Sequence, residues 1–127
     1  MSTAPAPRVL VVEDDPGVID VLSELLTREG YEVERANHGI DAIVRLTAAE
    51  EAPPQLVILD IGLPLESGVA VLEFIRSTMR SSLPVIVLTA SVTPEQEAEI
   101  QRLGVNRLLR KPAATSLLLS AVAELIG

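Results

Sequence analysis

The sequence contains no cysteine. Disulfide bonds and thiolate chemistry are therefore excluded, and the composition is the one expected of a cytoplasmic protein. Only Tyr31 and Phe74 are aromatic, so the core has to be aliphatic. No apolar run approaches the roughly 20 residues that span a bilayer. The first residues also lack the charged and apolar regions of a signal peptide, and we expect no membrane partner.

Positive charge is scarce as well. Ten basic residues stand against eighteen acidic ones, giving a formal net charge of −8. Direct nucleic-acid binding is disfavoured, because it needs a basic patch to meet the phosphates. Nine of the basic residues are arginine, and the only lysine is Lys111. Because ammonium and guanidinium groups are not interchangeable, the single lysine suggests a position that needs a compact cation.

What the chain does contain is enough apolar material for one domain. It has 127 residues, of which 48% are hydrophobic. This length favours a single globular unit. Residues 1–7 are rich in alanine and proline and are expected to form a disordered tail, so the domain is predicted to cover residues 8–127.

Short aliphatic runs alternate five times with amphipathic segments. The runs at 9–12, 56–60 and 83–88 are too short for helices and favour buried strands. Residues 31–35 alternate like a strand exposed on one side, which places them at a sheet edge, and residues 105–109 are predicted to form a short fifth strand. The helices are predicted at about 16–29, 40–49, 68–79, 93–103 and 114–126. This alternation predicts an α/β protein, with a five-stranded parallel sheet covered by helices on both faces.

Local signals fix several helix ends. Asp15 before Pro16 is an N-cap followed by proline at the first helical position. Thr93-Pro94-Glu95-Gln96 combines a cap, a proline and a capping box. The first helix carries apolar residues at helical spacing, and the third is predicted to run through Met79 on one continuous apolar face. The apolar residues of the first helix are Val18, Val21, Leu22, Leu25 and Leu26.

Polar residues follow four of the predicted strands. They are Glu13, Asp14 and Asp15 after the first, Asp60 after the third, Thr89 after the fourth and Lys111 after the fifth. Asp60 alone is better explained as a turn residue. Parallel strands, however, end at one edge of the sheet, where ligands collect in open α/β folds. The coincidence of these residues at that edge favours a functional site.

The residue types at this edge indicate a chemistry. Clustered carboxylates repel one another unless a cation intervenes. Oxygen ligands without His or Cys favour Mg²⁺, which keeps several waters and accepts one or two carboxylates plus a phosphate. Asp60 is central in the set and is a candidate nucleophile for aspartyl-phosphate formation. Thr89 and Lys111 are candidates for contacting the phosphoryl oxygens.

Five motifs in order give a family resemblance. They are Val-Val-Glu-Asp-Asp-Pro at 11–16, Leu-Val-Ile-Leu-Asp at 56–60, Leu-Pro-Leu-Glu-Ser-Gly at 63–68, Leu-Thr-Ala at 88–90 and Lys-Pro at 111–112. Together they resemble a response-regulator receiver domain of two-component signalling, over essentially the whole chain after the tail. The resemblance implies a flavodoxin-like sheet with strand order 2-1-3-4-5.

The resemblance also assigns roles. It implies that Asp60 accepts a phosphoryl group from a phosphohistidine on a sensor histidine kinase or a histidine phosphotransfer protein. Mg²⁺ would be held directly by Asp14 and Asp60, through water by Glu13, and by the backbone carbonyl of Gly62. The protein would be a signalling switch and not an enzyme, beyond its own phosphorylation and dephosphorylation.

The remaining implied roles lie on the fourth and fifth strands. Thr89 would act as the switch hydroxyl, Lys111 would contact the phosphoryl oxygens, and the peptide bond before Pro112 would be cis. Activation would change the surface formed by the fourth helix, the fifth strand and the last helix.

Two positions depart from the family pattern. Leu108 stands where an aromatic residue usually flips inward on activation, and Ala113 stands where a bulky apolar residue usually follows the proline. The usual relay from threonine to aromatic cannot operate, so signal output is expected to be atypical.

The last helix has one narrow polar stripe, formed by Ser116, Ser120 and Glu124. A helix lying on a sheet buries about one face, so apolar surface is left for a partner or a second copy; the alternative is that small residues such as Ala121 and Ala123 simply face water. Two other functions stay open for the chain. One is a degenerate receiver serving as an interaction module, and the other is a Mg²⁺-dependent phosphohydrolase.

Overall fold

The computed structural model describes residues 6–49, 52–62, 67–90, 92–112 and 115–127. The predictions for Ala113 and for the tail before residue 6 concern positions outside these ranges. The strands are β1 (Arg8–Val12), β2 (Glu32–Ala36), β3 (Leu56–Asp60), β4 (Val85–Thr89) and β5 (Arg107–Arg110). The helices are α1 (Pro16–Arg28), α2 (Gly39–Ala48), α3 (Ser67–Glu73), η2 (Phe74–Thr78), α4 (Pro94–Leu103) and α5 (Thr115–Ile126).

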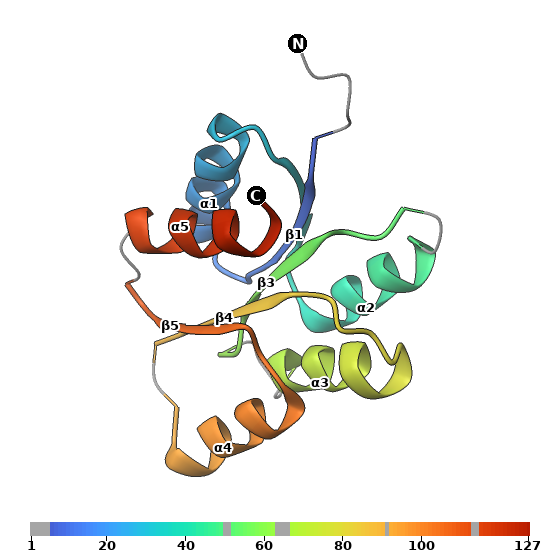
Figure 1. Ribbon diagram of the computed structural model, residues 1–127. Coiled ribbons are helices and arrows are strands. Elements are labelled where there is room, and N and C mark those ends of the chain that lie inside the picture. Colours follow the sequence, from blue (N-terminus) through green and yellow to red (C-terminus); the bar gives the residue numbers. More distant parts are fainter. Residues whose placement is uncertain (1–5, 50–51, 63–66, 91, 113–114) are drawn as a thin grey trace.

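The strands form one parallel sheet in the order β2-β1-β3-β4-β5. Helices α1 and α5 lie on one face, and α2, α3 and α4 lie on the other (Figure 1). The predicted fold class, strand order and helix layers are therefore confirmed. Within the described residues, no helix is both long enough and apolar enough to cross a membrane.

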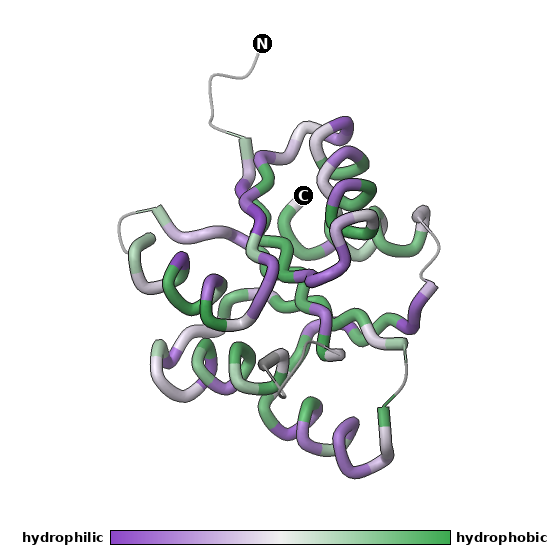
Figure 2. The backbone as a smooth tube through the Cα atoms, turned by 180° about the vertical axis from the view of Figure 1, so that it is seen from behind, coloured by the Kyte–Doolittle hydropathy of each residue, from purple (hydrophilic) through white to green (hydrophobic). Residues whose placement is uncertain are grey.

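The sheet separates two aliphatic cores. Side chains alternate across a strand, so Leu10 and Val12 of β1 enter the core under α2, α3 and α4, while Val9 and Val11 enter the core under α1 and α5. Strands β3 and β4 are buried along their whole length. Figure 2 shows this as hydrophobic colour through the central strands and alternating colour along the helices.

The helix caps follow the sequence signals. Asp15 accepts hydrogen bonds from the backbone N–H groups of Gly17 and Val18 at the start of α1. Thr93 and Gln96 form the predicted capping box at the start of α4. At α2 the cap is His38, whose Nδ1 accepts the N–H of Asp41 at 3.1 Å.

Two details of the helices differ from the predictions. The third helix is not continuous, because α3 gives way to a π-helical turn, η2, whose extra residue rotates the following side chains. The prediction of the buried face of α1 is also wrong in part. Ile19, Leu22 and Leu26 are buried, whereas Val21 is 58% exposed. A helix on a sheet buries a single stripe, and Val21 lies on a different side of the helix from the stripe formed by the three buried residues.

Helix α4 provides a test of packing. Its one fully buried side chain is Ile100, which is 0% exposed. We expect Ile100→Ala to lower the free energy of unfolding by about 2–5 kcal/mol, because it leaves a cavity in the core. Urea denaturation measures the loss.

The matched control is Ile40→Ala on α2, where the isoleucine is 73% exposed. This substitution should change the free energy of unfolding by no more than about 0.5 kcal/mol. Equal losses at the two positions would contradict the packing assigned to α4.

Candidate functional site

Four parallel strands bring the predicted site residues to one edge of the sheet. Glu13 follows β1, Asp60 ends β3, Thr89 ends β4 and Lys111 follows β5. In the strand register Asp60 pairs with Leu88, and the N–H of Lys111 donates to the carbonyl of Thr89 at 2.7 Å. The sheet therefore makes neighbours of residues that are up to 98 positions apart in the chain.

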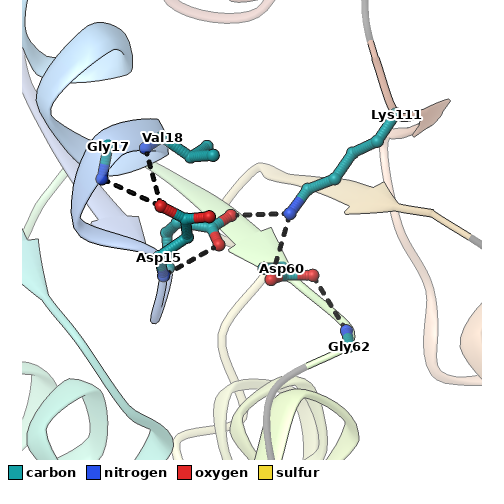
Figure 3. A network of polar contacts seen from close by, with 7 residues as sticks. Asp15, Gly17, Val18, Asp60, Gly62 and Lys111 are labelled. Atoms are coloured by element: carbon teal, nitrogen blue, oxygen red, sulfur yellow. Dashed lines mark hydrogen bonds and ion pairs between the residues drawn. The ribbon is translucent and has the colours of Figure 1, made fainter.

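Lys111 is the centre of this arrangement. Its Nζ donates to Oε2 of Glu13 at 2.8 Å and lies 3.1 Å from Oδ2 of Asp60. Figure 3 shows the ammonium group reaching from the end of β5 toward the carboxylate of Asp60. One cation is thus shared between two buried carboxylates.

Asp60 is also held from its other side. Its Oδ1 accepts the backbone N–H of Gly62 at 2.9 Å, which turns the chain immediately after β3 (Figure 3). Helix α3 then begins close behind this turn. A Cβ on Gly68 would lie 2.7 Å from Cα of Ile61, so only glycine permits this approach. Gly68 therefore shapes the backbone beneath Asp60, a role that its place in a motif did not reveal.

Three carboxylates form a possible metal site. Ligand oxygens of Glu13, Asp14 and Asp60 all lie within 4.8 Å of one another. Glu13 and Asp60 are buried, and Asp14 is exposed. An all-oxygen set that is partly open to solvent fits Mg²⁺, which prefers carboxylates and retains water.

Burial dominates the electrostatics of Glu13. Burial raises the pKa of its carboxyl group, the hydrogen bond from Lys111 opposes that effect, and the charge of Asp60 adds to it. For Lys111, burial disfavours the ammonium, but the hydrogen bonds and charges of Glu13 and Asp60 outweigh burial and raise its pKa. The ammonium form of Lys111 is therefore favoured, whereas burial disfavours the ionised form of Glu13.

The other predicted residues have distinct surroundings. Asp15 caps α1, as predicted, and the side chain of Thr89 is fully buried at the end of β4. The Lys111–Pro112 peptide bond is cis. Leu108 pairs with Val87 in the sheet and packs, half-buried, against the core under α3 and α4.

Comparison with known proteins identifies the class. The family model of the response regulator receiver domain matches residues 9–123. The chain therefore belongs to the response regulator receiver domain family. Receiver domains of this family are signalling switches of two-component systems, accept phosphate from sensor histidine kinases and bind Mg²⁺ at an acidic pocket.

Similar proteins with curated descriptions are longer than this chain. It is 39% identical over 104 residues to the transcriptional regulatory protein KdpE of Mycobacterium tuberculosis, covering 82% of this chain and 44% of that protein. It is 35% identical over 121 residues to the transcriptional regulatory protein PrrA of the same species, covering 95% and 50%. The chain thus spans about half the length of these relatives.

Solved structures of similar size share the fold. A CheY-like receiver domain from Methanospirillum hungatei JF-1 matches with a TM-score of 0.85 and 28% identity, covering 94% of this chain and 92% of that one. A receiver protein from Pseudomonas putida matches with a TM-score of 0.85 and 29% identity, covering 96% and 99%.

The raised pKa of Glu13 predicts a pH dependence of stability without divalent cations. The unfolded carboxyl ionises near its ordinary value of 4.5, and the folded one ionises at higher pH. Above pH 4.5 the folded state therefore binds more protons than the unfolded state, and stability falls as pH rises. Urea denaturation at a series of pH values from 4.5 upward should show the wild type losing stability relative to Glu13→Gln until the folded carboxyl group is fully ionised.

Glu95→Gln, at an exposed carboxylate of α4, serves as the control and should follow wild type at every pH. A Glu13→Gln difference that stays flat, or grows in favour of wild type as pH rises, would contradict the effect of burial on Glu13.

Proposed function

We propose that this chain is a phosphoryl-accepting switch in which Asp60 takes a phosphoryl group from a phosphohistidine. The observation that carries this proposal is the contact of Lys111 with Asp60 at 3.1 Å, beside the carboxylates of Glu13 and Asp14. A cation and candidate metal ligands surround one buried carboxylate, which is the arrangement that phosphoryl transfer needs.

The proposed transfer forms one bond and breaks one bond. A carboxylate oxygen of Asp60 forms a bond to phosphorus while the phosphorus–nitrogen bond of the phosphohistidine breaks. The electron pair of that bond returns to the imidazole nitrogen, so the donor leaves as a histidine side chain. The donor is a sensor histidine kinase or a histidine phosphotransfer protein.

The carboxylate cluster supplies the metal shell in this proposal. Asp14 and Asp60 would hold Mg²⁺ directly, Glu13 would act through water, and the Gly62 carbonyl would complete the protein ligands. When bound, Mg²⁺ neutralises charge on the transferred group. The exposure of Asp14 supports its role as an entry ligand, because a hydrated cation reaches it first.

Lys111 and Thr89 contact the phosphoryl group once it is bound to Asp60. In the unphosphorylated site the ammonium group is shared between Glu13 and Asp60. A phosphoryl group on Asp60 offers it stronger acceptor oxygens, and Thr89, at the end of the adjacent strand, donates its hydroxyl to the same group. This redistribution at the ends of β4 and β5 is passed to the α4-β5-α5 surface.

Output from that surface differs from the usual scheme. Leu108 has no ring to rotate, and it packs half-buried against the core that contains Ile100 of α4. We infer that the signal reaches α4 through aliphatic packing. Leu117 on α5 is 54% exposed, which supports a contact with a target protein or a second copy, whereas Ala121 is buried and contributes nothing to that surface.

An interaction module without phosphorylation is the second candidate function. Leu108 at the switch position favours it, because the usual coupling side chain is absent. The carboxylates, the threonine and the lysine at the strand ends favour the phosphorylated switch. The experiment below separates the two.

Phosphorylation is tested by intact mass measurement. The protein is incubated with Mg²⁺ and a small phosphodonor, and we expect a gain of one phosphoryl group that disappears in Asp60→Asn. Asp20→Asn, at an exposed carboxylate of α1, should retain the gain. If the wild type gains no phosphoryl group, even with its cognate kinase, the result contradicts the phosphorylated switch and favours a function as an interaction module.

Metal binding is tested by titration calorimetry. Loss of a ligating carboxylate in Asp14→Asn should weaken Mg²⁺ binding by about tenfold or more, since even indirect partners of a metal contribute this much. The neighbouring variant Asp15→Asn should bind Mg²⁺ nearly as wild type does, because Asn caps a helix as well as Asp. Equal weakening by the two substitutions would argue against Asp14 as a specific ligand.

A further inference from the structure

The opposite edge of the sheet, where the strands begin, carries an open cavity with a partly polar lining. It has a volume of about 520 Å³ and lies between the segment that precedes β4 and the segment that precedes β5. Its polar lining consists of Arg76, Arg80, Ser81, Ser82 and Asn106. Among the residues that the structure describes, no carboxylate lines it, although the chain as a whole has a net charge of −8.

The arginines of this cavity stand apart from the other cations. Within the described part of the chain, seven of the ten basic side chains form ion pairs with a carboxylate. Arg76, Arg80 and Arg110 do not, and two of these three line the same cavity. Arg76 is half-buried, whereas Arg80 is exposed. Half-buried charges are normally paired, so the lack of a carboxylate partner at Arg76 suggests that a ligand supplies one, with Arg80 beside it.

Arg76 is held in a fixed orientation. Its Nε donates to the carbonyl of Gly104 at 3.0 Å, and its Nη1 donates to the carbonyls of Ser81 and Leu83 at 2.9 and 2.7 Å. Its Nη2 makes no hydrogen bond to any residue that the structure describes. Burial lowers the pKa of this guanidinium group, with no carboxylate to offset the effect. An anion bound at Nη2 would offset the effect of burial on the charged guanidinium group.

Asn106 adds an oriented donor. Its Oδ1 accepts the N–H of Val85 at 3.0 Å, so the amide is turned with its NH₂ group as the remaining end. The Oγ of Ser81 likewise accepts an N–H, from Leu83 at 3.1 Å, and keeps its own hydrogen for another acceptor. The polar groups around the cavity therefore offer donors and few acceptors.

Arg80 has an unusual backbone. Its φ is +50°, in the left-handed region that a residue with a long side chain rarely adopts. This residue directly follows Met79, the C-cap of η2, where a left-handed conformation commonly ends a helix. Here it places a second guanidinium group at the cavity that Arg76 already lines.

We propose that this cavity binds a small oxyanion, a phosphate or a carboxylate group, between the guanidinium groups of Arg76 and Arg80 and the amide of Asn106. Fork-shaped guanidinium groups match the oxygens of such anions. The site lies at the far end of β4 from Asp60 and does not depend on the phosphorylation proposed above.

The test is a titration of the full chain with inorganic phosphate, without Mg²⁺ and at constant ionic strength set by sodium chloride. Amide shifts in the nuclear magnetic resonance spectrum report where phosphate binds. We expect saturable shifts at Ser81, Ser82 and Asn106. A parallel titration with acetate distinguishes the two ligand types. The anion with the lower apparent dissociation constant is the preferred ligand.

Arg80 is the residue to change, because Arg76 also holds three carbonyl groups of the fold. Arg80→Asn removes the charge and keeps a residue that tolerates the left-handed backbone. It should raise the apparent dissociation constant about tenfold, the worth of one charge-assisted hydrogen bond. Arg110→Gln removes the third unpaired arginine, which does not line the cavity, and should leave the constant unchanged.

Three results would overturn the proposal. One is the absence of saturable shifts with either anion at constant ionic strength. Another is shifts confined to the Asp60 edge of the sheet. The third is equal weakening by Arg80→Asn and Arg110→Gln, which would show a general effect of net charge.

Discussion

The constraint that governs this molecule is the placement of several carboxylates around one ammonium group. Glu13 is 1% exposed, and Asp60 is buried beside it. Such a pair of negative charges is unfavourable in a nonpolar surrounding unless a cation lies between them. Lys111 supplies that cation, and no other basic side chain of the described residues contacts Asp60. The site therefore requires β5 to lie within reach of β1 and β3.

The rest of the fold serves this requirement. β1 and β3 are neighbours in the sheet, and β4 separates β3 from β5. The lysine thus has to extend across the end of β4, and its backbone N–H is tied to the carbonyl of Thr89 on that strand. A long, flexible stem with a compact charge suits this span. This accounts for a lysine at the one position where the arginine-rich sequence uses one.

The sequence allowed the fold and the membership of the site to be predicted. Aliphatic strands ending in polar residues indicate both the parallel sheet and its functional edge, since strand ends converge whatever the details of the helices. Asp15 and Thr93 were recognised as caps because capping depends on local spacing alone. The local chemistry of the chain is consistent with its global fold.

What the sequence did not reveal depends on contacts between distant segments. The direct bond between Glu13 and Lys111 joins residues 98 positions apart, and Gly68 matters only because α3 approaches Ile61 closely. The π-helical turn escapes a periodicity argument, because its residues still fit an apolar helical pattern. Val21 was misassigned for a related reason, since a pattern shows which residues are apolar but not which stripe faces the sheet.

The two edges of the sheet use positive charge in opposite ways. At the Asp60 edge one cation serves several carboxylates, and a phosphoryl group would add negative charge there. At the opposite edge the guanidinium groups of Arg76 and Arg80 have no carboxylate partner within the described part of the chain, and carbonyl groups accept hydrogen bonds from Arg76. Arg76 donates a hydrogen bond to the carbonyl of Gly104, which ends α4, so an anion at this edge would act on the helix through which we propose that the phosphorylation signal passes. Helix α4 is held at its C-terminal end by Arg76 and in its middle by Ile100, while its N-terminal turn follows the strand that ends in Thr89. Together with β5, which runs from one edge of the sheet to the other, α4 is the part of the proposed output surface that both edges reach.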